Sequence, residues 1–311
     1  MIGSGGFCDL AGLPRATFDA VFSRPDVIVA GVFAPAGSVA PAPGGYRVRG
    51  RWGFASGCEH ADVLYGNGVE VGEDGDGAEG AEGAEGAGVH RLRMALFTRD
   101  EVQIEDTWTA AGLCGTGSHH IRADDVVVPA ERTFDVMTAA DCLDAPILRV
   151  PRPALFAVQI AAVALGVARG ALDDLRALAA GKVPMFDGEA LAANPLFRFD
   201  LAGAESGLHA ARALLDDLAT SAWRRAVRDD PVTLEQRARL RAAAAWATAQ
   251  AVDVVTTAHR AAGSGAVHAD STLARRLRDI GVLRQHFLVK RDVLTTAGAV
   301  LSGGEPAVPV F

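Results

Sequence analysis

Residues 148–180 read LRVPRPALFAVQIAAVALGVARGALDDLRALAA, and the character of the chain changes inside this stretch. From Leu155 to Ala180 the sequence is rich in alanine and leucine and contains no proline, a composition that favours one long helix. Before it, short apolar runs alternate with glycine and proline. The change of hydrophobic period at Pro151 to Pro153 therefore predicts two structural parts that meet near residue 150.

The first part contains several β-type runs separated by turn signals. These runs are residues 27–33, 46–54, 63–71, 91–98 and 120–128. Short strands at such spacing predict an antiparallel, barrel-like β-domain over residues 25–134. Between two of the runs, residues 72–88 read GEDGDGAEGAEGAEGAG. We expect this tract to be a disordered loop, because it offers little apolar surface to bury.

The second part has helical periodicity. After residues 155–180, a second helix is predicted over residues 196–227, and a third ends where Gly263-Ser-Gly265 begins. A fourth helix is expected to start near Asp270 or Ser271 and to pass through His286. The predicted class is thus α+β: the β-domain, a linker at residues 135–150, and a four-helix bundle over residues 151–311. Such long apolar helices also predict a homodimer or homotetramer.

Composition limits the partners that this chain can have. The 311 residues carry a net charge of -8, whereas a nucleic-acid surface needs a basic stripe. No uninterrupted apolar run reaches the roughly 18 residues that span a bilayer, so no membrane partner is expected. The four cysteines are far apart and form no C-x-x-C pair, which fits reduced thiols and a cytoplasmic location.

Three groups of residues follow one another in a specific order. The first is GVFAPAG at 31–37 with GGYRVRGRWGFASG at 44–57, the second is DTW at 106–108 with GLCGTGSHH at 112–120, and the third is RD at 278–279 with QH at 285–286. In this order and spacing they resemble the β-domain and helical bundle of the acyl-CoA dehydrogenase superfamily. The resemblance is strongest to its flavin-dependent monooxygenase branch and spans nearly the whole chain.

The resemblance implies a flavin, FMN or FAD, supplied in reduced form by a separate flavin reductase. Seven residues of the first part would contact it: Val32, Phe33, Phe54, Ala55, Ser56, Thr116 and Ser118. Among them, the Ser56 hydroxyl would face the reactive end of the ring, where a hydrogen bond can tune the chemistry. From the residues alone, Ser56 also fits an ordinary turn serine, and Thr116 to Ser118 an ordinary glycine turn.

His286 is the predicted catalytic residue of the second part. In the dehydrogenases this region commonly carries a glutamate that abstracts a proton, but here no acid lies between Asp279 and Asp292. A histidine at this place resembles the hydroxylase branch, where it takes a proton from, or orients, a small aromatic or amine substrate. Asp279 is expected to brace the helix through Arg275 or Arg276. Taken alone, His286 also fits a helix histidine at an interface.

Other charged residues have weaker implications. Lys182 and Arg198 match a region where the family often places cations against flavin phosphate, although both also fit ordinary surface charges. The adjacent His119 and His120 would point to opposite faces of a strand, so no metal site is expected. The function predicted first is therefore a monooxygenase subunit; the alternatives are a dehydrogenase acting on CH–CH groups and a non-catalytic oligomer partner of a full-length homologue.

The start of the chain departs from the family pattern. The family opens with a helical domain, of which we expect residues 1–24 to be a remnant. A misassigned start, a domain supplied by another chain and a degenerate paralogue are three explanations that the sequence leaves open.

Overall fold

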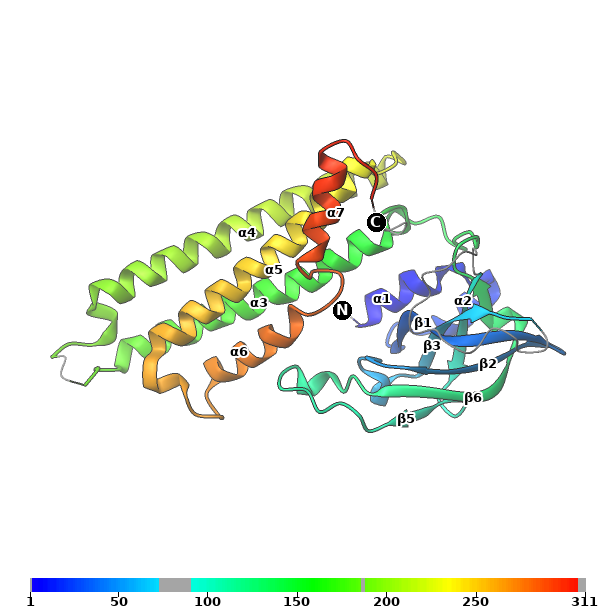
Figure 1. The fold of residues 1–311 in the computed structure, drawn as a ribbon, viewed down its shortest axis with the longest axis horizontal. Coiled ribbons are helices and arrows are strands. Elements are labelled where there is room, and N and C mark those ends of the chain that lie inside the picture. Colours follow the sequence, from blue (N-terminus) through cyan, green and yellow to red (C-terminus); the bar gives the residue numbers. More distant parts are fainter. Residues whose placement is uncertain (1, 73–90, 186–187, 307–311) are drawn as a thin grey trace. The chain divides into compact units, whose positions relative to one another are not determined.

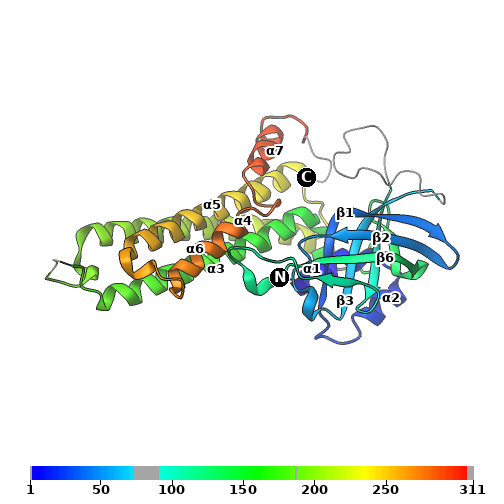
Figure 2. The ribbon, with the colours of Figure 1, turned by 60° about the horizontal axis from the view of Figure 1, so that its bottom comes forward.

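The computed structural model describes residues 2–72, 91–185 and 188–306. The chain divides into two compact units, each shown as a ribbon in Figures 1 and 2. The sheet unit contains Met1–Thr109 and Cys114–Leu148, and the helical unit contains Ala110–Leu113 and Arg149–Phe311. The acidic tract predicted to be a disordered loop lies, apart from Gly72, outside the described residues.

In the part of the chain that the structure describes, the sheet unit is built on one seven-stranded mixed sheet. Its strands are β1 (Val29–Ala42), β2 (Gly45–Trp52), β3 (Val63–Glu70), β4 (Leu92–Thr98), β5 (Gln103–Glu105), β6 (His120–Pro129) and β7 (Thr133–Asp135). Their order is β5-β6-β2-β1-β3-β4-β7, with β5 and β7 at open edges. The expectation of an antiparallel barrel is wrong in two respects, because the sheet is not closed and β1 pairs with β3 in parallel.

The parallel pair follows from the hairpin before it. β2 returns antiparallel along the second half of β1, so β2 ends at Trp52 beside the middle of β1 and the chain runs on toward the start of β1. A short connection with one 3₁₀ turn, η2 (Cys58–His60), then suffices to start β3 at Val63 on the other side of β1. Sequence patterns show the strands but do not reveal on which side of β1 the third one pairs.

Trp52 is the centre of the core of the sheet unit. Its side chain is completely buried and its indole N–H donates to the backbone oxygen of Asn67 at 2.7 Å. Three glycines make room for the ring: a Cβ on Gly37, Gly50 or Gly66 would lie 2.5–2.6 Å from Trp52 atoms. The core around it is aliphatic and aromatic: Val39, Val48, Leu64, Phe97, Ile121 and Val128.

Two short helices precede the sheet. α1 (Ile2–Asp9) packs against β1, and α2 (Arg15–Val21) follows after a 3₁₀ turn, η1 (Leu10–Gly12). The Tyr65 hydroxyl on β3 donates to the Asp9 carboxylate at 2.6 Å, and burial raises the pKa of Tyr65 well above its ordinary value. This buried bond ties the end of α1 to the middle of the sheet.

Over its described residues, the helical unit contains three long helices and two shorter ones. They are α3 (Arg152–Gly181), α4 (Pro195–Val227), α5 (Leu234–Ala262), α6 (Thr272–Leu283) and α7 (Asp292–Leu301). α5 contacts each of the other four, and α3, α4 and α5 run side by side in Figure 1. Alanines dominate the buried faces, which lets the helix axes approach closely.

The fourth predicted helix is divided, and His286 lies in the break rather than inside a helix. α6 ends at Leu283, and residues 284–291 form turns before α7 begins. The turns bury Leu288 and Val289 in the helical core. The break also lets α7 pack Val293, Ala297 and Val300 on a separate cluster with α5.

α3 is the most apolar of the long helices. By length and composition alone it could cross a bilayer. The absence of a long uninterrupted apolar run in the sequence is therefore not enough to exclude a membrane-spanning helix. A buried core helix passes the same test, and α3 contributes Ile160, Leu172 and Leu175 to the helical core. This packing explains the hydrophobicity of the buried face of α3.

Candidate active site

The first part of the predicted flavin site is an irregular stretch of β1. The register with β3 shifts between Val32 and Pro35 and again between Pro35 and Gly37, and β2 pairs with β1 only from Gly37 onward. Bulges of this kind leave backbone groups outside the ladder. The Phe33 carbonyl accepts a hydrogen bond from the side-chain N–H of Asn67 at 2.9 Å.

Asn67 was not predicted from the sequence as part of the site. Its side chain is completely buried, and it joins Phe33 on β1 to the indole of Trp52 on β2. The sequence contains a signal for this role, because Asn67 stands between two glycines inside the otherwise apolar run of β3. A buried polar side chain requires such partners.

The chain turns sharply after Trp52. Phe54 has a positive φ of 64°, and its ring is 75% exposed, an unusual combination for a large aromatic residue. The ring meets Trp108 edge-on with centroids 6.0 Å apart. Ala55 is buried in the sheet core and its N–H donates to the carbonyl of His119. The turn therefore holds Phe54 outward while Ala55 anchors it.

Three hydroxyl groups meet beside this turn. The Ser56 and Ser118 oxygens are 2.7 Å apart, and so are the Ser118 and Thr116 oxygens. The backbone N–H of Gly57 also donates to the Thr116 carbonyl at 2.8 Å. The structure thus brings together three predicted site residues that are up to 62 positions apart in sequence. We call Ser56, Thr116 and Ser118 the hydroxyl cluster.

His119 and His120 support the cluster from the strand side. The Nδ1 atom of His119 accepts the N–H groups of Thr107 and Trp108 at 3.1 and 3.2 Å. The Nδ1 atom of His120 lies 2.5 Å from the Thr107 hydroxyl. Both imidazole rings therefore bind residues 107–108 and so position the Trp108 side chain against Phe54.

In the helical unit, His286 has the properties of a neutral imidazole. Burial lowers its pKa, and its Nδ1 atom faces the backbone N–H of Leu288 at 3.3 Å. The ring stacks on Phe287 with centroids 5.0 Å apart. Because Nδ1 accepts a hydrogen bond, the neutral ring carries its proton on Nε2. His286 can therefore act as a hydrogen-bond donor through Nε2 at neutral pH.

The two candidate phosphate-binding cations both contact backbone carbonyls of the helical unit. Lys182 Nζ donates to the carbonyl of Ala262 at 2.6 Å, at the end of α5, and Arg198 Nε donates to the carbonyl of Ala192 at 2.9 Å. A cation at a helix C-terminus satisfies a carbonyl that has no helical partner. These contacts explain both residues structurally, and their role toward a phosphate stays a prediction.

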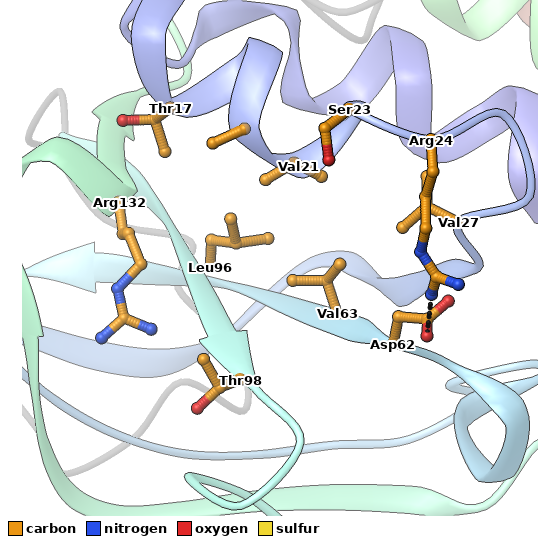
Figure 3. A pocket seen from close by; sticks show the side chains of 11 residues that line it. Thr17, Val21, Ser23, Arg24, Val27, Asp62, Val63, Leu96, Thr98 and Arg132 are labelled. Atoms are coloured by element: carbon orange, nitrogen blue, oxygen red, sulfur yellow. Dashed lines mark hydrogen bonds and ion pairs between the residues drawn. The ribbon is translucent and has the colours of Figure 1, made fainter.

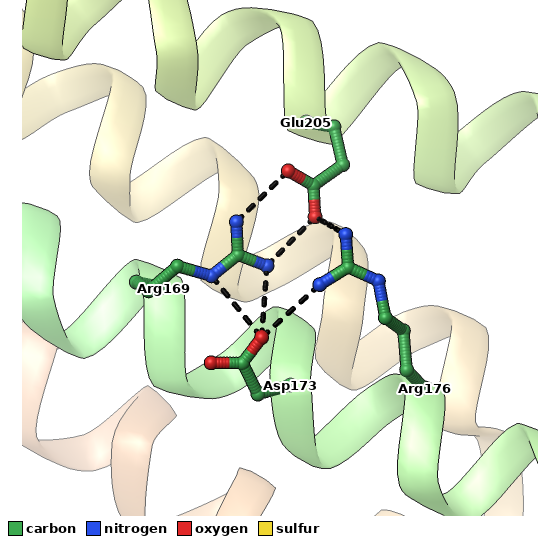
Figure 4. A network of polar contacts seen from close by, with 4 residues as sticks. All are labelled: Arg169, Asp173, Arg176 and Glu205. Atoms are coloured by element: carbon green, nitrogen blue, oxygen red, sulfur yellow. Dashed lines mark hydrogen bonds and ion pairs between the residues drawn. The ribbon is translucent and has the colours of Figure 1, made fainter.

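A separate ion-pair network links α3 to α4. Figure 4 shows Glu205 of α4 between Arg169 and Arg176 of α3, with Asp173 beneath both guanidinium groups. Arg169 is the main cause of a lowered pKa at Glu205. Every charge in the network has a partner of opposite sign, so the network fixes two helices and leaves no charge directed at a ligand.

A hollow of about 370 Å³ lies elsewhere on the sheet unit (Figure 3). Leu96, Val21 and Val63 form its apolar wall. Its two arginines are engaged, Arg24 with Asp62 and Arg132 with both oxygens of Glu101. None of the residues predicted for the active site lines this hollow.

The donor set of the hydroxyl cluster fits a flavin. In the Ser56–Ser118 contact and in the Thr116–Ser118 contact, either oxygen can be the donor. The Ser56 hydroxyl can therefore either donate or accept a hydrogen bond. A flavin ring nitrogen carries a proton in the reduced ring and none in the oxidised ring, and a serine of this kind can serve both states. The irregular β1 stretch and the exposed Phe54 ring supply backbone groups and an aromatic surface beside it.

Comparison with known proteins identifies the family. Residues 158–291 match the family model described as acyl-CoA dehydrogenase, C-terminal domain. An indole-3-acetate monooxygenase from Pseudomonas putida is 33% identical over 96% of this chain and 73% of its own length. The oxygenase subunit HsaA of a flavin-dependent monooxygenase from Rhodococcus jostii is 29% identical over 84% of this chain and 67% of its own length.

A solved structure shows the same fold. XiaF from a Streptomyces species, in complex with FADH2 and glycerol, superposes with a TM-score of 0.87 at 24% identity, covering 99% of this chain and 77% of its own. The chain belongs to the flavin-dependent monooxygenases of the acyl-CoA dehydrogenase superfamily. The resemblance read from the three groups of sequence motifs is confirmed.

Proposed function

We propose that this chain is an oxygenase component that hydroxylates a small aromatic compound with reduced flavin and molecular oxygen. When bound, the reduced flavin supplies the electrons that activate oxygen. The relatives that act on aromatic compounds or are named as oxygenase subunits support this class and a separate flavin reductase as partner. Structural neighbours are complexes with FADH2 and with FMN, so the proposed cofactor is FAD or FMN. The wide spacing of the four cysteines is compatible with a cytoplasmic location.

One observation separates this function from that of a dehydrogenase. Asp279 is the carboxylate that comes closest before His286 in the sequence, and its Oδ1 accepts the backbone N–H of Leu113 at 2.7 Å. Residues 280–291 contain no acid. The group left for proton chemistry in this segment is the neutral imidazole of His286. With Nδ1 accepting the Leu288 N–H and the proton on Nε2, this ring is set to donate a hydrogen bond to a polar group on an aromatic ring rather than to take a proton from carbon.

In the proposed site the residues of this chain have distinct tasks. Phe54, Val32 and Phe33 would line the flavin, and Ser56 would hold a hydrogen bond at its reactive end. His286, with its proton on Nε2, would donate to an oxygen substituent of the substrate, such as a phenol or carboxylate oxygen. The burial that lowers the pKa of His286 keeps it in this form.

Ser56→Ala is expected to uncouple the reaction. Without the hydroxyl, more oxygen should leave as hydrogen peroxide, and the ratio of hydroxylated product to peroxide should fall about tenfold, equivalent to ~1.4 kcal/mol. The measurement supplies reduced FAD and oxygen with indole-3-acetate as probe, and quantifies product and peroxide. Ser221→Ala, at an exposed position on α4, is the matched control.

Three results would count against the proposal. If Ser56→Ala and Ser221→Ala give the same ratio, the hydroxyl cluster does not control the oxygen chemistry. If an acyl-CoA reduces the bound flavin and the probe is never hydroxylated, the chain is a dehydrogenase. Failure of the wild-type chain to bind any flavin would support the non-catalytic alternative.

The helical unit is expected to associate with a second copy. Leu196, Phe199 and Trp223 on α4 are 69%, 76% and 45% exposed, an unusual amount of apolar surface for one helix. Light scattering should give at least twice the mass of one chain at micromolar concentration. Phe199→Asp should lower that mass, while Arg212→Asp, at an exposed charged position of the same helix, should not. A monomer for the wild-type chain would contradict this prediction.

A further inference from the structure

A four-residue segment of the chain leaves the sheet unit and returns to it. Ala110–Leu113 belongs to the helical unit, although Thr109 before it and Cys114 after it belong to the sheet unit. The segment sits inside the connection between β5 and β6, which runs from residue 106 to residue 119. Trp108 precedes the segment closely, and Thr116 and Ser118 of the hydroxyl cluster follow it.

Three features hold this segment on α6. The Leu113 N–H donates to Asp279 Oδ1 at 2.7 Å. Gly112 lies so close to the helix that an added Cβ would be 2.3 Å from the carbonyl oxygen of Arg278. Leu113 has a positive φ of 52° and packs against the helical core. Strained backbone of this kind persists only where the surroundings determine it.

Asp279 does not have the role expected from the sequence. It was expected to brace α6 through Arg275 or Arg276, but Arg276 donates to Asp174 on α3 at 2.6 Å. The Asp279 carboxylate instead accepts from a residue 166 positions earlier in the chain. A hydrogen bond from a backbone N–H to a carboxylate is stronger than one between neutral groups.

We propose that Asp279 is a positioning residue that fixes the loop carrying the hydroxyl cluster. On the sheet side, His119 already holds Thr107 and Trp108. Asp279 fixes the next stretch, so that both ends of the remaining turn from Cys114 to Ser118 are anchored and the hydroxyl groups keep one arrangement. A loop with a free end would sample many arrangements. The consequence for oxygen chemistry rests on the function proposed above.

Hydrogen exchange measures the anchoring without any flavin. In the apoprotein, Asp279→Ala should speed amide exchange in peptides covering residues 110–118 about tenfold, because the Leu113 N–H loses its acceptor. Asp279→Asn keeps an amide oxygen in place and should restore most of the protection. Asp253→Ala, which removes an exposed carboxylate from α5, is the matched control and should leave these peptides unchanged.

A second variant covers the case in which Asp279→Ala does not fold. Gly112→Ala pushes the same segment away from α6 and leaves Asp279 intact, so it should also speed exchange at residues 110–118. Unchanged exchange in Asp279→Ala or in Gly112→Ala would overturn the proposal. So would equal acceleration in Asp279→Asn and Asp279→Ala, since the hydrogen bond would then not be the cause.

The chemical consequence has its own readout. The product-to-peroxide ratio should fall about fivefold in Asp279→Ala while the thermal midpoint of the protein is unchanged. Asp279→Asn should recover the ratio. A purely structural role would lower the thermal midpoint and leave the ratio unchanged. If exchange responds but the ratio does not, Asp279 anchors the loop without positioning the hydroxyls. If the wild-type chain hydroxylates nothing, the proposed function fails, and the exchange experiment still decides the anchoring.

Discussion

Replacing His286 with alanine is expected to lower kcat/KM for the hydroxylation of an aromatic probe by about 100-fold, because the substrate loses the Nε2–H hydrogen bond that orients it. The imidazole is held by the Leu288 N–H and by stacking on Phe287, so its Nε2–H is oriented before substrate binds. His286→Gln keeps an N–H donor and should retain more activity than His286→Ala. Steady-state product formation with saturating reduced FAD measures the effect.

The pH dependence gives an independent check on His286. Burial lowers its pKa, so the neutral ring persists below the ordinary imidazole value of about 6.5, and activity should fall only at lower pH. In the same window the unfolded chain binds a proton that the folded chain does not, so stability falls as the pH drops toward the lowered pKa. His286→Gln should remove that part of the pH dependence. An acid limb of activity at or above 6.5 would contradict the neutral-donor role.

Replacing Trp52 with alanine is expected to be the most destabilising single change in the sheet unit. It empties the centre of the core and leaves the three glycines that accommodate the ring facing a cavity. Changes of this type cost about 3–5 kcal/mol in the free energy of unfolding. Equilibrium unfolding in urea, followed by circular dichroism, measures the loss.

Trp246 supplies the matched control for that experiment. The same substitution at this position removes a side chain that is 36% exposed on α5, so Trp246→Ala should cost clearly less than Trp52→Ala. Gly66→Ala tests the same packing from the other side, since its Cβ would lie 2.6 Å from the Trp52 ring. A loss below about 1 kcal/mol in Trp52→Ala would show that the sheet core does not depend on this residue.

The sequence by itself determined the local structure and the family. Alanine and leucine without proline are sufficient for the long helix α3, because helix propensity and periodicity act within one segment. Glycine at the β1–β2 turn is likewise a local signal, and Gly44 has a positive φ of 84°. The three groups of motifs then indicated the family, and with it Ser56, Thr116, Ser118 and His286 as candidates.

The tertiary structure decided the relations between distant segments. The parallel pairing of β1 with β3, the break that places His286 between α6 and α7, and the meeting of Ser56 with Ser118 depend on how surfaces pack after the elements have formed. The bond from Leu113 to Asp279 joins residues 166 positions apart, and neither residue type is distinctive in sequence. Local patterns cannot encode such contacts, because each is fixed by burial and chain connectivity summed over the whole unit.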